Sequence, residues 1–180
     1  GIGGVYSTYI CEHNYFYKIG LTSHDAAILG GNSSGVTNTI TATDNFIEKS
    51  TNGILMQTDY DCDLETNKLT TCGYGVDIEN STGHAINIDG NLFADCDNGV
   101  ELYDVSETAD CDIVNNTFMG EFGSDGVPVN STAIGMELSS FGYLAAYVYN
   151  NTIENYPNSI YAANMQCGDG STATIEANTI

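Results

Sequence analysis

The chain has 180 residues, about the length of one domain, and 42% of them are hydrophobic. Its 24 acidic residues stand against three lysines, with no arginine, and the formal net charge is −21. Nucleic acids and anionic membrane surfaces are bound through lysine and arginine, so this balance argues against both as partners. No apolar run approaches the length of a membrane span, so we expect no membrane insertion.

The expected elements are short strands from one end of the chain to the other. Residues that favour long helices are scarce. β-Branched runs such as 37–43 near the start and 172–175 near the end are separated by Gly and Asn. The sequence therefore predicts an all-β fold.

The main organising feature is an internal repeat of about two dozen residues. Each copy reads apolar-x-x-Asn-x-apolar and continues with Gly-apolar-x-apolar, as in 86–102. Successive anchoring asparagines are 22, 24, 25, 35 and 27 residues apart. These asparagines are Asn45, Asn67, Asn91, Asn116, Asn151 and Asn178. Such a period indicates a solenoid, in which stacking of the copies creates the core.

Each part of the repeat predicts a local structure. An apolar-x-apolar piece is a short strand whose alternate side chains point inward. The asparagine is expected at a bend, where it tolerates left-handed backbone geometry, and stacked asparagines are expected to bond to one another as a ladder. The glycine before the next strand is expected to supply a positive φ at a second bend.

With this repeat, the chain resembles the right-handed parallel β-helix proteins of the pectate-lyase-like superfamily. The resemblance covers 38–180 and implies about six or seven rungs of 22–25 residues. We expect 1–37 to form an N-terminal cap or an irregular first rung. The resemblance implies a fold and not a function, because this fold hosts lyases, hydrolases, phage spikes, adhesins and surface proteins.

The interval between Asn116 and Asn151 contains an insertion. Two segments compete for the Gly-apolar-x-apolar position of that rung, 126–129 and 135–138. The second leaves 13 residues to the next asparagine, as in neighbouring rungs. We therefore place the strand at 135–138 and an inserted loop at 119–134. Insertions in solenoids often form the binding face.

The cysteines have no CxxC spacing, which argues against a zinc ribbon. Cys72 and Cys96 occupy one column on consecutive rungs, within disulfide range, so a disulfide and a stacked thiol pair both remain open. Cys62 and Cys111 share a column two rungs apart and are too distant to bond to each other.

Two groups of acidic residues follow from this register. The candidate metal ligands are Asp77, Glu101 and Glu137 in one outward column, and Asp59, Asp61 and Asp63 at alternate positions. Clustered carboxylate oxygens suit Ca²⁺, which is the candidate ion. The alternative is a solvated acidic face in a saline environment, where salt screens the repulsion.

The expected location is extracellular or at the cell surface. An even number of cysteines suits an oxidising compartment, although buried unpaired thiols fit equally well. The candidate glycosylation sites are Asn32, Asn80, Asn115, Asn130 and Asn150. Their number is no more than chance predicts, so they are only compatible with glycosylation.

Catalysis is not the function that the residues favour. A polysaccharide lyase of this fold uses an Arg or Lys base, but the chain has no arginine, and Lys49 and Lys68 fall at turn or outward positions. The alternative enzyme is a glycoside hydrolase that uses the Asp59, Asp61 and Asp63 cluster, although the signature residues of such hydrolases are missing.

The favoured function is that of a non-catalytic extracellular structural protein. The start of the chain is β-prone, and its last residues open a new rung, so we expect copies to associate head-to-tail as a filament or surface layer. Cys11 of one copy would then approach Cys167 of the next. A fragment of a longer carbohydrate-binding adhesin remains an alternative, with extracellular polysaccharide as its candidate ligand.

Overall fold

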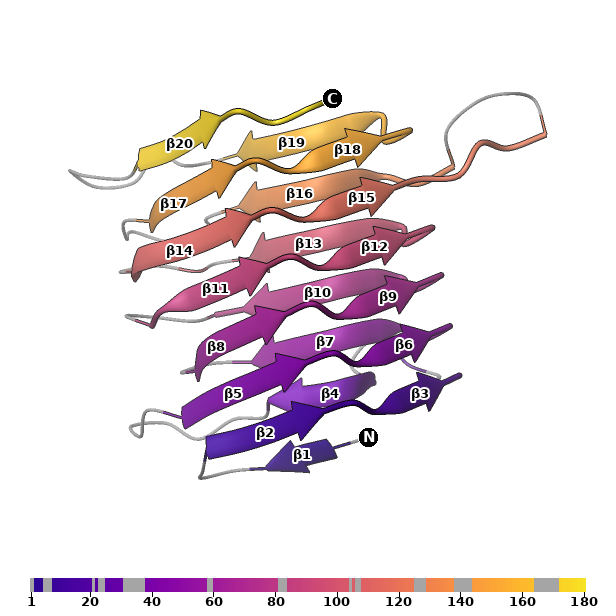
Figure 1. Cartoon of the computed structure of the whole chain (residues 1–180), viewed down its shortest axis with the longest axis vertical. Helices are drawn as coiled ribbons and strands as arrows, with labels where there is room; N and C mark the ends of the chain where they lie inside the picture. Colours follow the sequence, from indigo (N-terminus) through magenta and orange to yellow (C-terminus); the bar gives the residue numbers. More distant parts are fainter. Residues whose placement is uncertain are drawn as a thin grey trace.

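The computed structural model describes residues 2–4, 8–20, 22, 25–30, 38–57, 60–80, 84–103, 105, 108–124, 129–137, 144–163 and 172–180. Within these ranges the regular structure is all strand. No helix there is long and apolar enough to cross a membrane. The strands form three parallel sheets that wind as a right-handed parallel β-helix, which confirms the predicted fold class (Figure 1).

We name the three sheets A, B and C. Sheet A contains β1 (Ile2–Gly4), β4 (Ala26–Gly30), β7 (Asn52–Gln57), β10 (Tyr74–Glu79), β13 (Asn98–Tyr103), β16 (Thr132–Glu137) and β19 (Asn158–Ala163). Sheet B contains β2 (Thr8–Glu12), β5 (Asn38–Thr43), β8 (Tyr60–Glu65), β11 (Ile86–Asp89), β14 (Thr108–Val114), β17 (Leu144–Tyr149) and β20 (Thr172–Glu176). Sheet C contains β3 (Tyr15–Tyr17), β6 (Phe46–Glu48), β9 (Lys68–Thr70), β12 (Leu92–Ala94), β15 (Thr117–Met119) and β18 (Thr152–Glu154).

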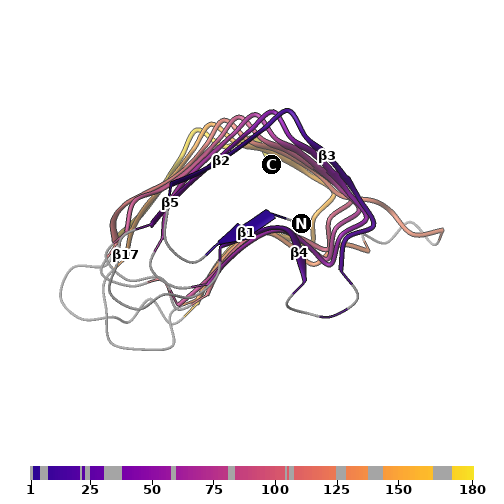
Figure 2. The ribbon, with the colours of Figure 1, turned by 90° about the horizontal axis from the view of Figure 1, so that it is seen from below.

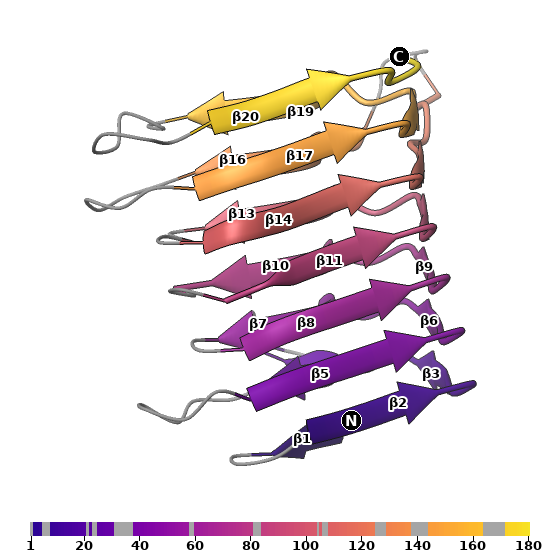
Figure 3. The ribbon, with the colours of Figure 1, turned by 60° about the vertical axis from the view of Figure 1, so that its left-hand side comes forward.

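The chain passes through the sheets in a fixed order, from B to C to A, and then starts the next rung. Seen along the solenoid axis, successive rungs lie almost on top of one another (Figure 2). The side view shows the strands of sheets A and B as two stacks of arrows that run in opposite directions (Figure 3). Each strand inside a sheet therefore pairs with its counterparts one rung before and one rung after, and not with its neighbours in sequence.

Interior side chains stack in columns of similar residues. In sheet C the central column contains Ile47, Leu69, Phe93, Phe118 and Ile153, all of which are buried. The rings of Phe93 and Phe118 stack with centroids 4.7 Å apart and planes 7° apart. Because every rung contributes to the same columns, the core is continuous along the axis.

The bend between sheets B and C contains a left-handed residue followed by an asparagine. Position 44 has a φ of 54° and directly precedes Asn45, and Gly90, with a φ of 65°, directly precedes Asn91. The same order recurs before every ladder asparagine of the described rungs. The expectation that the asparagine itself takes the left-handed geometry is therefore wrong. The preceding residue turns the chain, and the asparagine side chain is thereby directed inward.

The asparagines form a continuous hydrogen-bonded ladder. The backbone N–H and the Nδ2 of Asn67 both donate to Oδ1 of Asn91, at 2.8 and 3.0 Å, and Asn91 makes the same two bonds to Asn116. Nδ2 of Asn91 also donates to the carbonyl of Leu64 at 2.7 Å. The ladder contains Asn14, Asn45, Asn67, Asn91, Asn116, Asn151 and Asn178. The predicted column is thus present, and Asn14 extends it by one rung.

The repeated glycine in sheet A is required for packing and not for a positive φ. Gly53, Gly75 and Gly99 do not have left-handed backbone geometry, which corrects the sequence expectation. A Cβ atom on Gly99 would lie 2.5 Å from the carbonyl oxygen of Ala133 and 2.5 Å from the ring of Phe118. The missing side chain therefore allows the core rings of sheet C to lie against sheet A.

Two boundaries differ from the expectation. Residues within 1–37 supply strands to all three sheets, and β2 pairs in register with β5, so this segment contains regular rung structure. The insertion follows β15 and ends before β16, at 120–131 and not at 119–134 (Figure 1). The strand that follows is two residues earlier than expected, because 138–143 separates β16 from β17 whereas only 104–107 separates β13 from β14.

Loss of a central ladder amide is expected to destabilise the protein strongly. Asn91→Ala leaves the N–H of Asn67 and the carbonyl of Leu64 buried without these hydrogen bonds. Each such group costs about 1–3 kcal/mol, so the free energy of unfolding should fall by about 4 kcal/mol. Urea unfolding followed by circular dichroism measures the change. The control is Asn178→Ala, whose amide is only partly buried; an equal loss in both variants would contradict a cooperative ladder.

Candidate functional site

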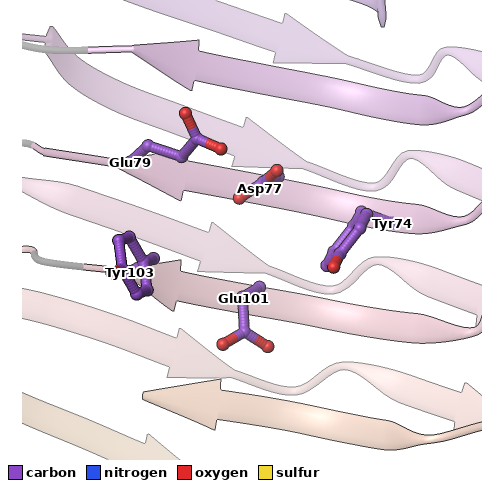
Figure 4. Close-up of a pocket in the computed structure, with 5 residues that line it drawn as sticks. All are labelled: Tyr74, Asp77, Glu79, Glu101 and Tyr103. Atoms are coloured by element: carbon purple, nitrogen blue, oxygen red, sulfur yellow. The ribbon is translucent and has the colours of Figure 1, made fainter. Parts of the chain in front are cut away.

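The candidate site is a pocket of about 350 Å³ on the outer face of sheet A. It lies across the neighbouring strands β10 and β13 (Figure 4). The residues that line it are Tyr74, Asp77, Glu79, Glu101 and Tyr103. Tyr74 and Tyr103 lie at opposite ends of the group, with Asp77 between them (Figure 4). We call this group the carboxylate pocket.

The alternation of a β-strand explains why these side chains face outward together. Val76 and Ile78 of β10 are buried in the core, so the odd-numbered Asp77 and Glu79 point to the other face. The parallel register then places Asp77 beside Glu101 and Glu79 beside Tyr103. Residues 24 positions apart in sequence thereby become direct neighbours.

Asp77 is the unusual member of the pocket, because it is only 6% exposed. On one side its partner in the register is Leu55, which is also buried, and on the other side it is Glu101. No residue in the described part of the chain donates a hydrogen bond to Asp77 or forms an ion pair with it. Burial, followed by the negative charges of Glu79 and Glu101, raises the pKa of Asp77 to about 7.

The other two carboxylates of the pocket lie against neighbouring rungs. Glu79 accepts a hydrogen bond from Nε2 of Gln57 at 3.0 Å. The side chain of Glu101 lies over Gly135 of the next rung, where an added Cβ atom would collide with its carboxylate. The pocket therefore holds three carboxylates that diverge from one another. Burial and the charges of Asp77, Glu101 and Glu79 also raise the pKa of Tyr74, whose hydroxyl stays protonated.

The expected carboxylate column is correct for two of its three members. Asp77 and Glu101 are adjacent, but Glu101 pairs with Gly135, and Glu137 pairs instead with Tyr103. Glu137 was misplaced because the strand after the insertion begins two residues earlier than expected. Three further residues of the pocket were not predicted from the sequence, namely Tyr74, Glu79 and Tyr103. The two-residue period of the same strands was the signal that could have found Glu79 and Tyr103.

The two described aspartates of the other expected cluster, Asp61 and Asp63, lie on β8 and contact residues of the next rung. Oδ1 of Asp63 accepts a hydrogen bond from Nδ2 of Asn87 at 2.7 Å, and Oδ1 of Asp61 lies 3.2 Å from Nδ1 of His84. The backbone N–H of Ala85 also donates to Asp61, at 2.9 Å. Oδ1 of each of these two carboxylates thus has a partner on the next rung, and Asp59 lies outside the described residues.

The described cysteines are free and buried. Cys72 and Cys96 contact each other on consecutive rungs as a hydrogen-bonded thiol pair, and donation from Cys96 lowers the pKa of Cys72. Ile86 separates Cys62 from Cys111 in their shared column, as expected. Burial raises the pKa of Cys62 to about 12 and also raises that of Cys111.

Cys11 is not placed for the expected bond between copies. Its thiol is buried, and Nδ2 of Asn14 donates to Sγ of Cys11 at 3.3 Å. The same thiol lies 3.6 Å from Oδ1 of Asn45 in the ladder. Cys167 lies outside the described residues. A disulfide through Cys11 would first have to break these interior contacts.

The candidate glycosylation sites differ in accessibility. Asn80, Asn115 and Asn150 are exposed, and each has a positive φ at a turn. Asn130 is buried, and its Nδ2 donates to the carbonyl of Cys96 at 2.8 Å. Asn130 is therefore a structural amide and a poor glycan acceptor. Asn32 lies outside the described residues.

The raised pKa of Asp77 predicts a pH-dependent stability. The folded protein holds a proton on Asp77 at pH values where the unfolded chain has lost it, so this contribution to stability falls as pH rises from about 4 to 7. Asp77→Asn removes the cost of ionisation. The free energy of unfolding of Asp77→Asn, relative to that of the wild type, should therefore increase by about 2 kcal/mol between pH 5 and pH 8.

Urea unfolding at the two pH values measures this difference. The matched control is Asp112→Asn, because Asp112 is exposed on sheet B. A parallel pH dependence in the two variants would show that Asp77 ionises normally.

A scan against protein families matches residues 11–124 to the family described as "Periplasmic copper-binding protein (NosD)". No curated protein and no solved structure matches the chain. The family description supports a location in the cell envelope or outside the cell.

The described residues do not fit a copper centre with three or more ligands. Copper is bound by imidazole, thiolate and thioether groups. His13 lies near Asp44 and His84 lies near Asp61, on separate rungs, and Cys62 is held as a buried thiol. No group of three or more His, Cys, Asp or Glu side chains in the described ranges can hold a metal ion, which also leaves the candidate Ca²⁺ site without support. The family match still extends over more than half of the chain, and the chain therefore belongs to the NosD family.

Proposed function

We propose that this chain is a non-catalytic structural protein outside the cytoplasm, in which the stacked rungs act as a stiff scaffold. The observation that carries this proposal is the asparagine ladder, which joins each rung to the next by the same pair of hydrogen bonds. Its bonds are buried and repeat along the axis, so bending the solenoid would break several of them at once. The family description supports the location.

We further propose that copies of the chain associate head-to-tail through rung edges. In a parallel β-helix the lower edge of one rung meets the upper edge of the next, so rung contacts are heterologous. Contacts of this kind between copies produce filaments when they do not close into a ring. The net charge of −21 opposes association at low salt.

Association should therefore increase as salt is added. Sedimentation velocity between about 0.05 and 1 M NaCl should show species larger than the 19.2 kDa monomer, and their share should rise as the charge is screened. Ile175→Lys should suppress these species, because Ile175 continues the interior column above Val148. Met119→Lys, on an exposed position of β15, which is paired on both sides and so is not a rung edge, is the control. A 19.2 kDa monomer at every salt concentration would rule out the filament.

A second candidate function is glycoside hydrolysis, which one specific observation favours. Asp77, with a pKa of about 7, lies beside Glu101 in the register. A carboxyl group that is protonated at neutral pH can act as a general acid while a second carboxylate acts as base or nucleophile. This pair replaces the Asp59, Asp61 and Asp63 cluster expected from the sequence. The likeness to the pectate-lyase-like superfamily remains a prediction.

Release of reducing sugar from a panel of neutral and acidic polysaccharides tests this candidate. If the pair is catalytic, Asp77→Asn should abolish turnover, because an amide cannot donate the proton to the leaving group. Asp112→Asn should leave turnover unchanged. Absence of turnover with the wild-type protein would support the non-catalytic proposal.

A further inference from the structure

We propose that the carboxylate pocket between β10 and β13 binds a small organic diamine or polyamine. The feature that points to this ligand is the buried carboxyl group of Asp77, which lines the pocket between two further carboxylates and two tyrosines (Figure 4). This inference goes beyond the scaffold role, and it does not depend on self-association or on hydrolysis.

Asp77 is buried and has no partner among the described residues. A carboxylate that is 6% exposed normally has hydrogen-bond donors or a positive charge beside it, because its desolvation is costly. Asp77 has neither among the described residues, and its oxygens face the pocket. A ligand that brings donors and positive charge would satisfy it.

The charged side chains that line the pocket are all acidic. The groups that face Asp77 are Glu79 and Tyr74 on its own strand and Glu101 and Tyr103 on β13, whereas Leu55 and Gln57 on β7 carry no charge. No lysine or arginine is among them. The described residues that line the pocket therefore supply acidic groups and no lysine, and a cationic ligand would relieve the repulsion between Asp77 and its acidic neighbours.

The lysines of the chain lie elsewhere on the solenoid. Lys18 and Lys49 follow strands of sheet C, and Lys68 begins one. Each lies over an aromatic ring of sheet C, at 5.6, 5.4 and 5.0 Å from the ring centroids. These contacts hold the positive charge of the chain on sheet C, away from the pocket strands of sheet A.

The size of the pocket favours an organic cation over an inorganic ion. Ca²⁺ needs six to eight oxygens within about 2.6 Å. The pocket carboxylates diverge, because Glu79 reaches Gln57 and Glu101 lies over Gly135, and they do not form a group that can hold a metal. A volume of about 350 Å³ instead suits a small molecule. A ligand with two or more separated ammonium groups can reach more than one carboxylate.

Two tyrosines line the pocket together with the carboxylates. Tyr74 lies at one side of the group of carboxylates, and Tyr103 lies at the other side, next to Glu79 in the register (Figure 4). Aromatic faces attract ammonium groups and pack against the methylene segments between them. Separated carboxylates with aromatic rings beside them therefore suit a ligand whose ammonium groups are joined by methylenes.

Isothermal titration calorimetry of the full chain with putrescine and spermidine tests the proposal. Titrations in about 0.15 M NaCl suppress diffuse attraction to the acidic surface, because the Debye length is then about 8 Å. We expect one bound amine per chain. Because Asp77 must ionise to pair with the amine, we expect the affinity to rise about tenfold between pH 6 and pH 8.

Matched variants separate a specific site from general counterion binding. Asp77→Asn should weaken binding at least about tenfold, which is the scale of one hydrogen bond to a charged group. Asp112→Asn removes the same charge from sheet B and should bind as the wild type does. Asp77→Leu serves as a second pocket variant, because Leu55 fills the same column in β7.

Three results would overturn the proposal. The first is equal weakening in Asp77→Asn and Asp112→Asn, or several amines bound per chain, either of which would indicate diffuse attraction. The second is equal affinity for 1,4-butanediol, which would indicate recognition of hydroxyl groups. The third is displacement of putrescine by an equal concentration of Mg²⁺, which would indicate a site for inorganic ions.

Discussion

The hydrogen bonds between stacked asparagines are the interaction on which the rest of this structure depends. At each bend from sheet B to sheet C, a left-handed residue turns the chain and directs the next side chain inward, where Oδ1 of Asn91, for example, accepts two bonds from Asn67. The same amide donates to the carbonyl of Leu64. One side chain thus satisfies two buried backbone groups at the bend, the N–H of Asn67 and the carbonyl of Leu64, and it fixes the height of each rung relative to the next.

Once the rungs are in register, every position of the repeat becomes a column. In the interior this is favourable, because Phe93 can stack on Phe118, and Gly99 leaves room for the ring. On the outer face of sheet A the same register brings Asp77 beside Glu101. Such a contact between like charges costs stability. A role in ligand binding explains why a carboxylate occupies a column that contains leucine in β7.

Charge is segregated around the solenoid, and this separates the possible roles of its faces. The lysines lie over aromatic rings of sheet C, and the pocket carboxylates lie on sheet A, with no lysine among the described residues that line the pocket. The described residues supply oxygen ligands that diverge, buried thiols, and histidines that lie beside aspartates. Membership of the NosD family therefore fits this chain through its repeat and location, and not through a copper centre in the described rungs.

The sequence by itself determined the solenoid, the column of asparagines and the adjacency of Cys72 to Cys96, because a regular period gives the same neighbours on every rung. It also paired Asp77 with Glu101. It misplaced Glu137, because an insertion interrupts the period and the connection after the next strand also changes length. Only the tertiary structure decided that Asp77 is buried with no partner among the described residues, and that Tyr74 and Tyr103 line its pocket. Burial and the direction of a side chain depend on what covers each face, and this is not a property of the repeat.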